Sequence, residues 1–147
     1  MTDPTALLDK VLHLSTLVNA DLARFEQESG LTTARIHLLW VLGMTGPATQ
    51  QSLAAALEVT PRNVTGLVNG LVDSGHVTRE AHPSDRRATL VTPTAKGRKA
   101  IRQLAKDHGE LGVQLFGDVP ERRLKAFETT LDETIARFAA LMEEAAQ

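Results

Sequence analysis

The 147-residue chain contains no cysteine and no tyrosine, one tryptophan and four phenylalanines. Without cysteine there is no disulfide, no thiolate nucleophile and no thiol redox sensor, and zinc sites built on sulfur are excluded. With so few aromatic rings, we do not expect a stacking platform for single-stranded nucleic acid. The core must therefore be built mainly from aliphatic side chains.

Long apolar runs are missing as well. No segment is long enough to cross a bilayer, and no basic start is followed by the apolar stretch of a signal peptide. We therefore expect a cytoplasmic protein without membrane contact. A chain of this length can bury one substantial core, so we predict a single domain over residues 1–147.

Motifs typical of enzymes and cofactor sites are also missing. His82, Ser84 and Asp85 are the residue types of a hydrolase triad, but they are crowded into one turn, which prevents the required geometry. The chain has no phosphate-binding glycine loop and no His-Glu-x-x-His sequence. We predict neither an enzyme nor a cofactor.

The net charge of −2 is unevenly distributed along the chain. Residues 60–106 carry nine Lys and Arg against three acids, a net charge of +6. The segments 1–59 and 107–147 have net charges of −3 and −5. Such a segregated positive stretch is typical of a polyanion site, although a solvated basic helix face would have the same composition.

Hydrophobic periodicity predicts a mainly helical chain. Asp3 and Pro4 begin a long amphipathic helix that Gly30 ends, and Thr33 can cap a second helix. Two further amphipathic helices are expected after Thr94, on either side of a break at 117–120. One small domain cannot bury the apolar stripes of the helices at both ends of the chain, which favours packing against a second subunit.

The middle of the chain has the pattern of a helix-turn-helix with a wing. A short helix over 50–57 is followed by a helix that Thr60 caps, that Pro61 begins and that Gly75 stops. Strands are predicted over 77–81 and 88–92, on either side of a polar loop. The predicted fold is mainly α with a small β-hairpin wing, with the reader over 33–92.

The segments Thr60–Val68, His82–Ala88 and Thr94–Gly97 resemble the MarR family of bacterial regulators, and the resemblance covers essentially the whole chain. It implies a homodimer held by the end helices, 1–30 and 94–147. It also implies a recognition helix in the major groove and a wing arginine in the minor groove of a palindromic duplex operator. Many members release DNA when a small, often aromatic or lipophilic, molecule binds between the two regions, and we predict that this chain is a repressor. Members often carry basic residues where this chain has Gly66 and Gly70.

The recognition helix and the wing supply the candidate DNA contacts. Arg and Asn can read guanine and adenine bidentately, so Arg62 and Asn63 are candidate base readers. The wing offers Arg87 for the minor groove, Arg86 for phosphate, and Asp85 to orient Arg87 through a charge-assisted hydrogen bond. The remaining candidates suit phosphate or base contacts and are Thr60, Thr65 and Asn69.

An effector pocket would be lined by residues that serve equally well as core, namely Leu14, Val18, Trp40, Leu104 and His108. Two alternatives remain open. Histidines, among them His13, His37 and His108, could serve a metal- or ligand-responsive sensor, and a winged helix could instead bind a protein. Steep loss of affinity with salt would distinguish a DNA binder from the latter.

Overall fold

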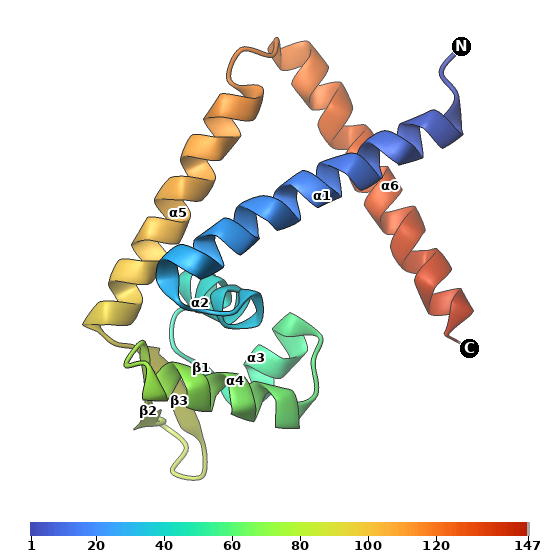
Figure 1. Ribbon diagram of the computed structural model, residues 1–147. Helices are drawn as coiled ribbons and strands as arrows, with labels where there is room; N and C mark the ends of the chain where they lie inside the picture. The colour runs from blue at the N-terminus through green and yellow to red at the C-terminus, as the bar shows by residue number, and fades with distance from the viewer. Residues whose placement is uncertain (147) are drawn as a thin grey trace. The chain divides into compact units, whose positions relative to one another are not determined.

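The computed structural model describes residues 1–146, which form six helices and three short strands (Figure 1). The chain divides into two compact units, residues 1–104 and 105–147, and helix α5 contributes to both. The single domain expected from the sequence stays a prediction. The elements in chain order are α1 (Pro4–Ser29), α2 (Thr33–Thr45), β1 (Ala48–Thr49), α3 (Gln50–Leu57), α4 (Pro61–Asp73), β2 (Val77–Ala81), β3 (Thr89–Pro93), α5 (Ala95–Phe116) and α6 (Glu121–Ala145).

The core of the first unit is aliphatic and joins the helix-turn-helix to the wing. Nine side chains from α2, α3, α4, β2 and β3 are fully buried: Leu38, Leu39, Leu42, Leu53, Val64, Val68, Leu71, Val77 and Val91. The apolar stripe predicted for α4 is therefore the face that packs inward. Burial of this kind stabilises by roughly 1.5–3 kcal/mol per large side chain, before the entropy cost of ordering the chain.

Side-chain caps set the helix boundaries close to those predicted. Asp3 caps α1, and Thr60 accepts a hydrogen bond from the Asn63 amide at 3.2 Å, with Pro61 in the first turn of α4. The prediction that Thr33 caps α2 is wrong, because the cap is Thr32. Thr33 lies inside the helix, where its amide and hydroxyl donate to the carboxylate of Glu26 in α1. Both bonds stabilise the charged carboxylate and so lower the pKa of Glu26, and the bond from the hydroxyl contributes more than the bond from the amide.

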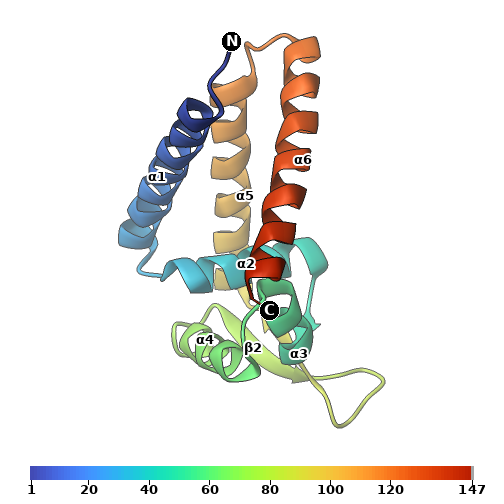
Figure 2. The same cartoon turned by 90° about the vertical axis from the view of Figure 1, so that its right-hand side faces the viewer.

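The wing is part of a three-stranded antiparallel sheet with the order β1-β3-β2. The strands β2 and β3 pair from Val77–Pro93 to Ala81–Thr89, and Figure 2 shows the loop between them projecting from the sheet. The outer strand β1 was not predicted, because two residues are too few to produce an alternating pattern. It pairs through Ala48 and Thr49 and so ties the start of α3 to the wing.

The first turn of α5 is bound tightly to the end of α4 and the start of β2. The hydroxyl of Thr94 accepts from the Gly97 amide at 3.1 Å, as an N-cap does, and donates to the carbonyl of Gly75 at 2.6 Å. The ammonium of Lys96 donates to the carbonyl of Ser74 at 2.8 Å. A Cβ added at Gly97 would lie far inside van der Waals contact with the main-chain oxygen of His76. Only glycine allows this approach.

The helices α1 and α6, each considered within its own unit, bury no residue. In the first unit, α1 extends away from the helices α2–α4 (Figure 1). Its exposed apolar side chains include Leu7, Val11 and Leu14, each between 46% and 49% exposed. In the second unit, Ile135 and Phe138 of α6 are 59% and 65% exposed. Among residues 1–146, no helix is both long and apolar enough to cross a membrane.

Candidate nucleic-acid interface

The helix α4 presents a polar face opposite its buried stripe. Arg62, Asn63, Gly66 and Asn69 are all exposed on that face. At 3.6 residues per turn, these positions lie on consecutive turns of one side. The positive end of the helix dipole lies at Pro61, beside Arg62 and Asn63, so this end of the helix favours an anion such as phosphate.

Some of the side chains predicted to contact DNA already form hydrogen bonds within the protein, and others do not. Thr60 accepts from the Asn63 amide, and the hydroxyl of Thr65 donates to the carbonyl of Pro61 at 3.0 Å. Both hydroxyls therefore help to hold the helix start. The described residues provide no hydrogen-bond or salt-bridge partner for the side-chain groups of Arg62 and Asn63. These two side chains keep their full capacity to bind a ligand.

A hydrogen-bond network that sequence reasoning missed joins α3, α4 and β2. Arg79 of β2 donates from Nη2 to Asn69 Oδ1 at 2.5 Å and from Nε to Gln50 Oε1 at 3.1 Å. The amide of Gln50 then donates to Thr65 Oγ1 at 3.0 Å. With Oδ1 engaged, the amide of Asn69 faces a ligand mainly as a donor, which suits phosphate better than adenine. The contacts join residues up to 29 positions apart, which local periodicity cannot reveal.

The two glycines of α4 have different surroundings. Nothing lies within 4 Å of a Cβ added at Gly66, so this position is open. A Cβ added at Gly70 would lie 2.5 Å from Cζ and Nε of Arg35, a half-buried residue of α2. Gly70 is therefore not bare solvent-facing surface, because the guanidinium of Arg35 covers it.

The wing loop is held by hydrogen bonds within its own turn. The Nδ1 atom of His82 accepts from the amides of Ser84 and Asp85, each at 3.1 Å. The carboxylate of Asp85 accepts from the main-chain amide of Arg87 at 3.0 Å. We expected a bond to the guanidinium, but the structure shows the bond to the backbone. Asp85 thus fixes the turn that carries Arg87. The side chains of Arg86 and Arg87 are both exposed.

Part of the positive charge of residues 60–106 has a structural role. Lys96 donates to the carbonyl of Ser74, and Arg98 donates from Nη1 to the carbonyl of Pro93 at 3.0 Å. The carbonyls at the end of α4 lack helical partners, so Lys96 satisfies one of them and opposes the helix dipole. Both side chains keep their positive charge, but each uses a donor within the protein and so has fewer donors left for a ligand.

The five residues expected to line an effector pocket occupy different environments. Leu104 belongs to the core, and Trp40 is half-buried against it. Leu14, Val18 and His108 are exposed. Among residues 1–146, no group of three or more His, Cys, Asp or Glu side chains could hold a metal ion. The histidine-based metal sensor therefore finds no support in the described chain.

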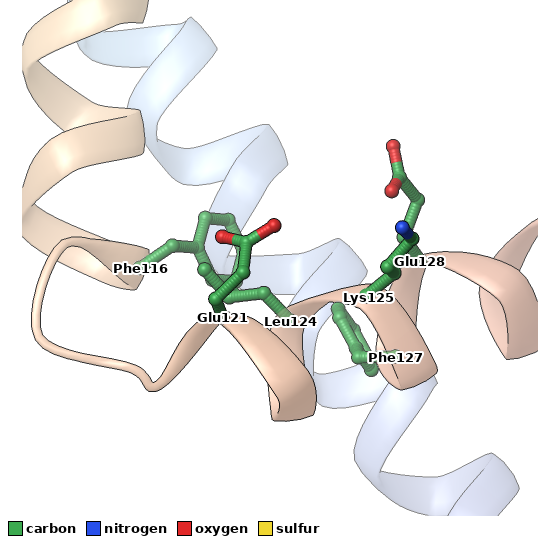
Figure 3. A pocket seen from close by; sticks show the side chains of 6 residues that line it. All are labelled: Phe116, Glu121, Leu124, Lys125, Phe127 and Glu128. Atoms are coloured by element: carbon green, nitrogen blue, oxygen red, sulfur yellow. The ribbon is translucent and has the colours of Figure 1, made fainter.

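An open pocket of about 370 Å³ lies in the second unit, at the turn between α5 and α6 (Figure 3). The rings of Phe116 and Phe127 lie 6.3 Å apart between centroids. None of the residues expected at an effector pocket lines it; its walls are Phe116, Glu121, Leu124, Lys125, Phe127 and Glu128. It is a shallow amphipathic surface rather than an enclosed site.

Two of the solved structures that share the fold contain a bound ligand or DNA. One is FabT of Streptococcus pneumoniae in complex with DNA, with a TM-score of 0.79 and 20% identity, covering 92% of this chain and 99% of that one. The other is CouR of Rhodococcus jostii RHA1 bound to p-coumaroyl-CoA, with a TM-score of 0.68 and 24% identity, covering 90% and 92% of the two chains.

Sequence comparison identifies the family. Residues 29–88 match the MarR family. The uncharacterized HTH-type transcriptional regulator ML2140 of Mycobacterium leprae (strain TN) is 31% identical over 103 residues, which cover 69% of this chain and 72% of that protein. The match includes α2, α3, α4 and most of the wing, the elements that form the polar and cationic surface described above. The chain belongs to the MarR family of winged helix-turn-helix transcriptional regulators.

Proposed function

We propose that this regulator binds a palindromic operator in duplex DNA as a homodimer, represses transcription by occupying that site, and leaves DNA when a small molecule binds. The observation that carries the proposal is the single polar face of α4, flanked by the wing. The side chains of Arg62 and Asn63 are exposed and have no hydrogen-bond partner among the described residues. They lie at the start of the recognition helix, where helix-turn-helix proteins contact bases. The DNA complex of FabT supports the same use of this fold.

The wing supports a second contact in the minor groove. Arg87 follows a turn that Asp85 and His82 hold by hydrogen bonds, so the backbone of the wing loop loses little conformational entropy when Arg87 binds. A narrow minor groove has an enhanced negative potential that attracts arginine. Arg86 beside it contacts phosphate. Repression needs no further surface, because a protein that covers a promoter blocks the polymerase.

The homodimer is supported by apolar surface that single units leave uncovered. Folded monomers rarely expose contiguous apolar patches above a few hundred Å². Yet α1 carries a run of half-exposed leucines and valines, and α6 exposes Leu131, Ile135 and Phe138 along one stripe. Helices with such faces are buried by packing against a second copy of the same surface.

The residues proposed to line the effector pocket also belong to the core or to the surface. The complex of CouR with p-coumaroyl-CoA supports a small molecule as the signal. Trp40 is the one tryptophan of the chain and lies half-buried against the core. A change in its fluorescence on titration with carboxylate or phenolic compounds would test this part of the proposal.

Selection of bound fragments from genomic DNA at physiological salt tests the main proposal. A two-fold dimer predicts enriched sites with two inverted half-sites about one helical turn, roughly 10 bp, apart. Affinity for such a site should fall steeply as salt rises. Enrichment of sites without two-fold symmetry would contradict the dimer. Failure to enrich any DNA would contradict DNA binding altogether and would favour a protein-binding winged helix.

A further inference from the structure

We propose that Arg35 of α2 is a phosphate contact of the reader, and that Gly70 of α4 provides the seat that positions its guanidinium. The proposal rests on the DNA-binding function proposed above and names a residue outside the recognition helix and the wing. Arg35 belongs to the acidic N-terminal segment, so neither motif nor local charge distinguishes it in the sequence.

The guanidinium occupies the space that a side chain at position 70 would fill. An added Cβ on Gly70 would lie 2.5 Å from both Cζ and Nε of Arg35, well inside contact distance. Gly70 has no positive φ, so the helix does not need glycine for its backbone conformation. The absence of a side chain here has its effect on packing, because it lets an arginine from another helix lie directly on α4.

The place of Gly70 on α4 determines where this charge lies. Gly70 follows Gly66 by four residues and Asn63 by seven, so it lies on one flank of the reading face. The network of Gln50, Arg79 and Asn69 lies on the opposite flank. An α-helix with its side chains is about 10–12 Å across and the major groove about 12 Å wide. The flanks of an inserted helix therefore face the sugar-phosphate backbones.

The chemistry of Arg35 fits a phosphate on that flank. Within residues 1–146, its guanidinium forms neither a salt bridge nor a side-chain hydrogen bond, so its donors stay available. Its main-chain amide is fixed by the cap Thr32. A planar guanidinium presents donors in a fork that matches two phosphate oxygens. A seated guanidinium also loses less rotamer entropy on binding than a free one.

Arg35→Gln tests the contact, and Arg24→Gln is the matched control. Arg24 is an exposed arginine of α1 that pairs with Asp21, so its replacement removes the same charge away from α4. Binding is measured by fluorescence anisotropy over a salt series, on a selected operator duplex and on a scrambled duplex. Arg35→Gln should weaken binding about tenfold on both duplexes and lower the salt slope by about one. Arg24→Gln should match wild type.

Gly70→Ala tests the seat. The added methyl group displaces only the end of a flexible side chain and adds helix propensity, so the melting temperature should not fall. DNA affinity should nevertheless fall, because the guanidinium must move. In an Arg35→Gln background, the same Gly70→Ala change should have little further effect on affinity. Circular dichroism melting of each variant establishes that it is folded.

The outcomes separate this inference from the proposed function. If wild type binds with a steep salt slope and Arg35→Gln has the same affinity and slope, Arg35 is not a phosphate contact. If Gly70→Ala weakens binding equally with and without Arg35, the methyl group acts on DNA directly and the seat is wrong. If wild type binds no duplex, the proposed function itself fails, independently of Arg35.

Discussion

The winged core of the first unit and the helices near the two chain ends satisfy the same hydrophobic demand in opposite ways. The core closes within one chain, because nine aliphatic side chains from five elements are fully buried together. In contrast, α1 and α6 are amphipathic but bury nothing within their own units. The winged core is thus complete within its own unit, whereas the apolar stripes of α1 and α6 are left uncovered within theirs, as the proposed homodimer requires.

The largest effect should come from a charge placed on the uncovered apolar stripe of α6. Ile135→Glu places a carboxylate on the apolar stripe of α6, where an interface would have to desolvate it. We expect the particle mass to fall toward the 15.9 kDa of one chain in sedimentation experiments. Operator affinity should drop by about 10²–10⁴-fold, because two linked readers become independent.

The control for this variant is Thr129→Glu, which adds the same charge to the opposite, polar side of α6. It should leave both mass and affinity unchanged. An Ile135→Glu protein with the same mass as wild type would show that the exposed stripe of α6 is not an interface, and the comparison between the two regions would then lose its main support.

The next largest effect should come from adding a methyl group where α5 lies closest to the winged core. Gly97→Ala forces a methyl group against the main-chain oxygen of His76, and backbone cannot move aside as a flexible side chain can. We expect a loss of about 1–3 kcal/mol in the free energy of unfolding, measured by urea denaturation. Gly109→Ala in the same helix meets nothing within 4 Å and should be neutral or stabilising. Equal effects of the two variants would contradict the close approach of α5.

A smaller effect, on operator affinity, is expected from removing the wing arginine that we propose to contact DNA. Arg87→Ala should weaken operator binding about tenfold without lowering the melting temperature, because the exposed guanidinium leaves the wing turn intact. Anisotropy titration and thermal melting measure the two quantities. Arg122→Ala removes another exposed arginine, from α6, and serves as the charge control. Unchanged binding by Arg87→Ala would remove the minor-groove role.

The smallest effect is the loss of stability at acid pH that His76 causes. Burial, and then the nearby Lys96, lower the pKa of His76 below its usual 6.5. The unfolded chain thus binds a proton more readily than the folded one, so stability is full above about pH 6.5 and falls as the pH drops through the lowered pKa. His76→Asn should lose less stability than wild type between about pH 7.5 and 5.5 in urea denaturation. Parallel pH profiles would contradict the assignment.

Local patterns predicted most of the fold because helices and hairpins have local causes. The α4 stripe, its cap Thr60 and the pairing of β2 with β3 all follow from spacing along the chain. The two-residue strand β1 was missed because its pairing comes from β3, which lies some forty residues later. Thr33 was mistaken for a cap because Thr32 has the same chemistry.

The candidate interface could be predicted only in outline. Arg62, Asn63 and Arg87 were identified because exposed residues on a helix face and at a loop tip follow from the pattern itself. Gln50, Arg79 and Arg35 were missed because their positions depend on contacts between elements far apart in sequence. For the same reason, the sequence could not show that Lys96 has a structural role.

The close contact between Gly97 and His76 has a mechanical consequence. Thr94, Lys96 and Gly97 bind the first turn of α5 to the end of α4 at several points, so these two helix ends move as one rigid body. At 1.5 Å per residue, the ten residues of α5 that belong to the first unit, 95–104, form a lever about 15 Å long. A tilt of about five degrees at this root corresponds to roughly 1.3 Å at residue 104. A displacement of about one ångström at the buried side chain of Leu104 is therefore enough to turn α4, without unfolding anything between them.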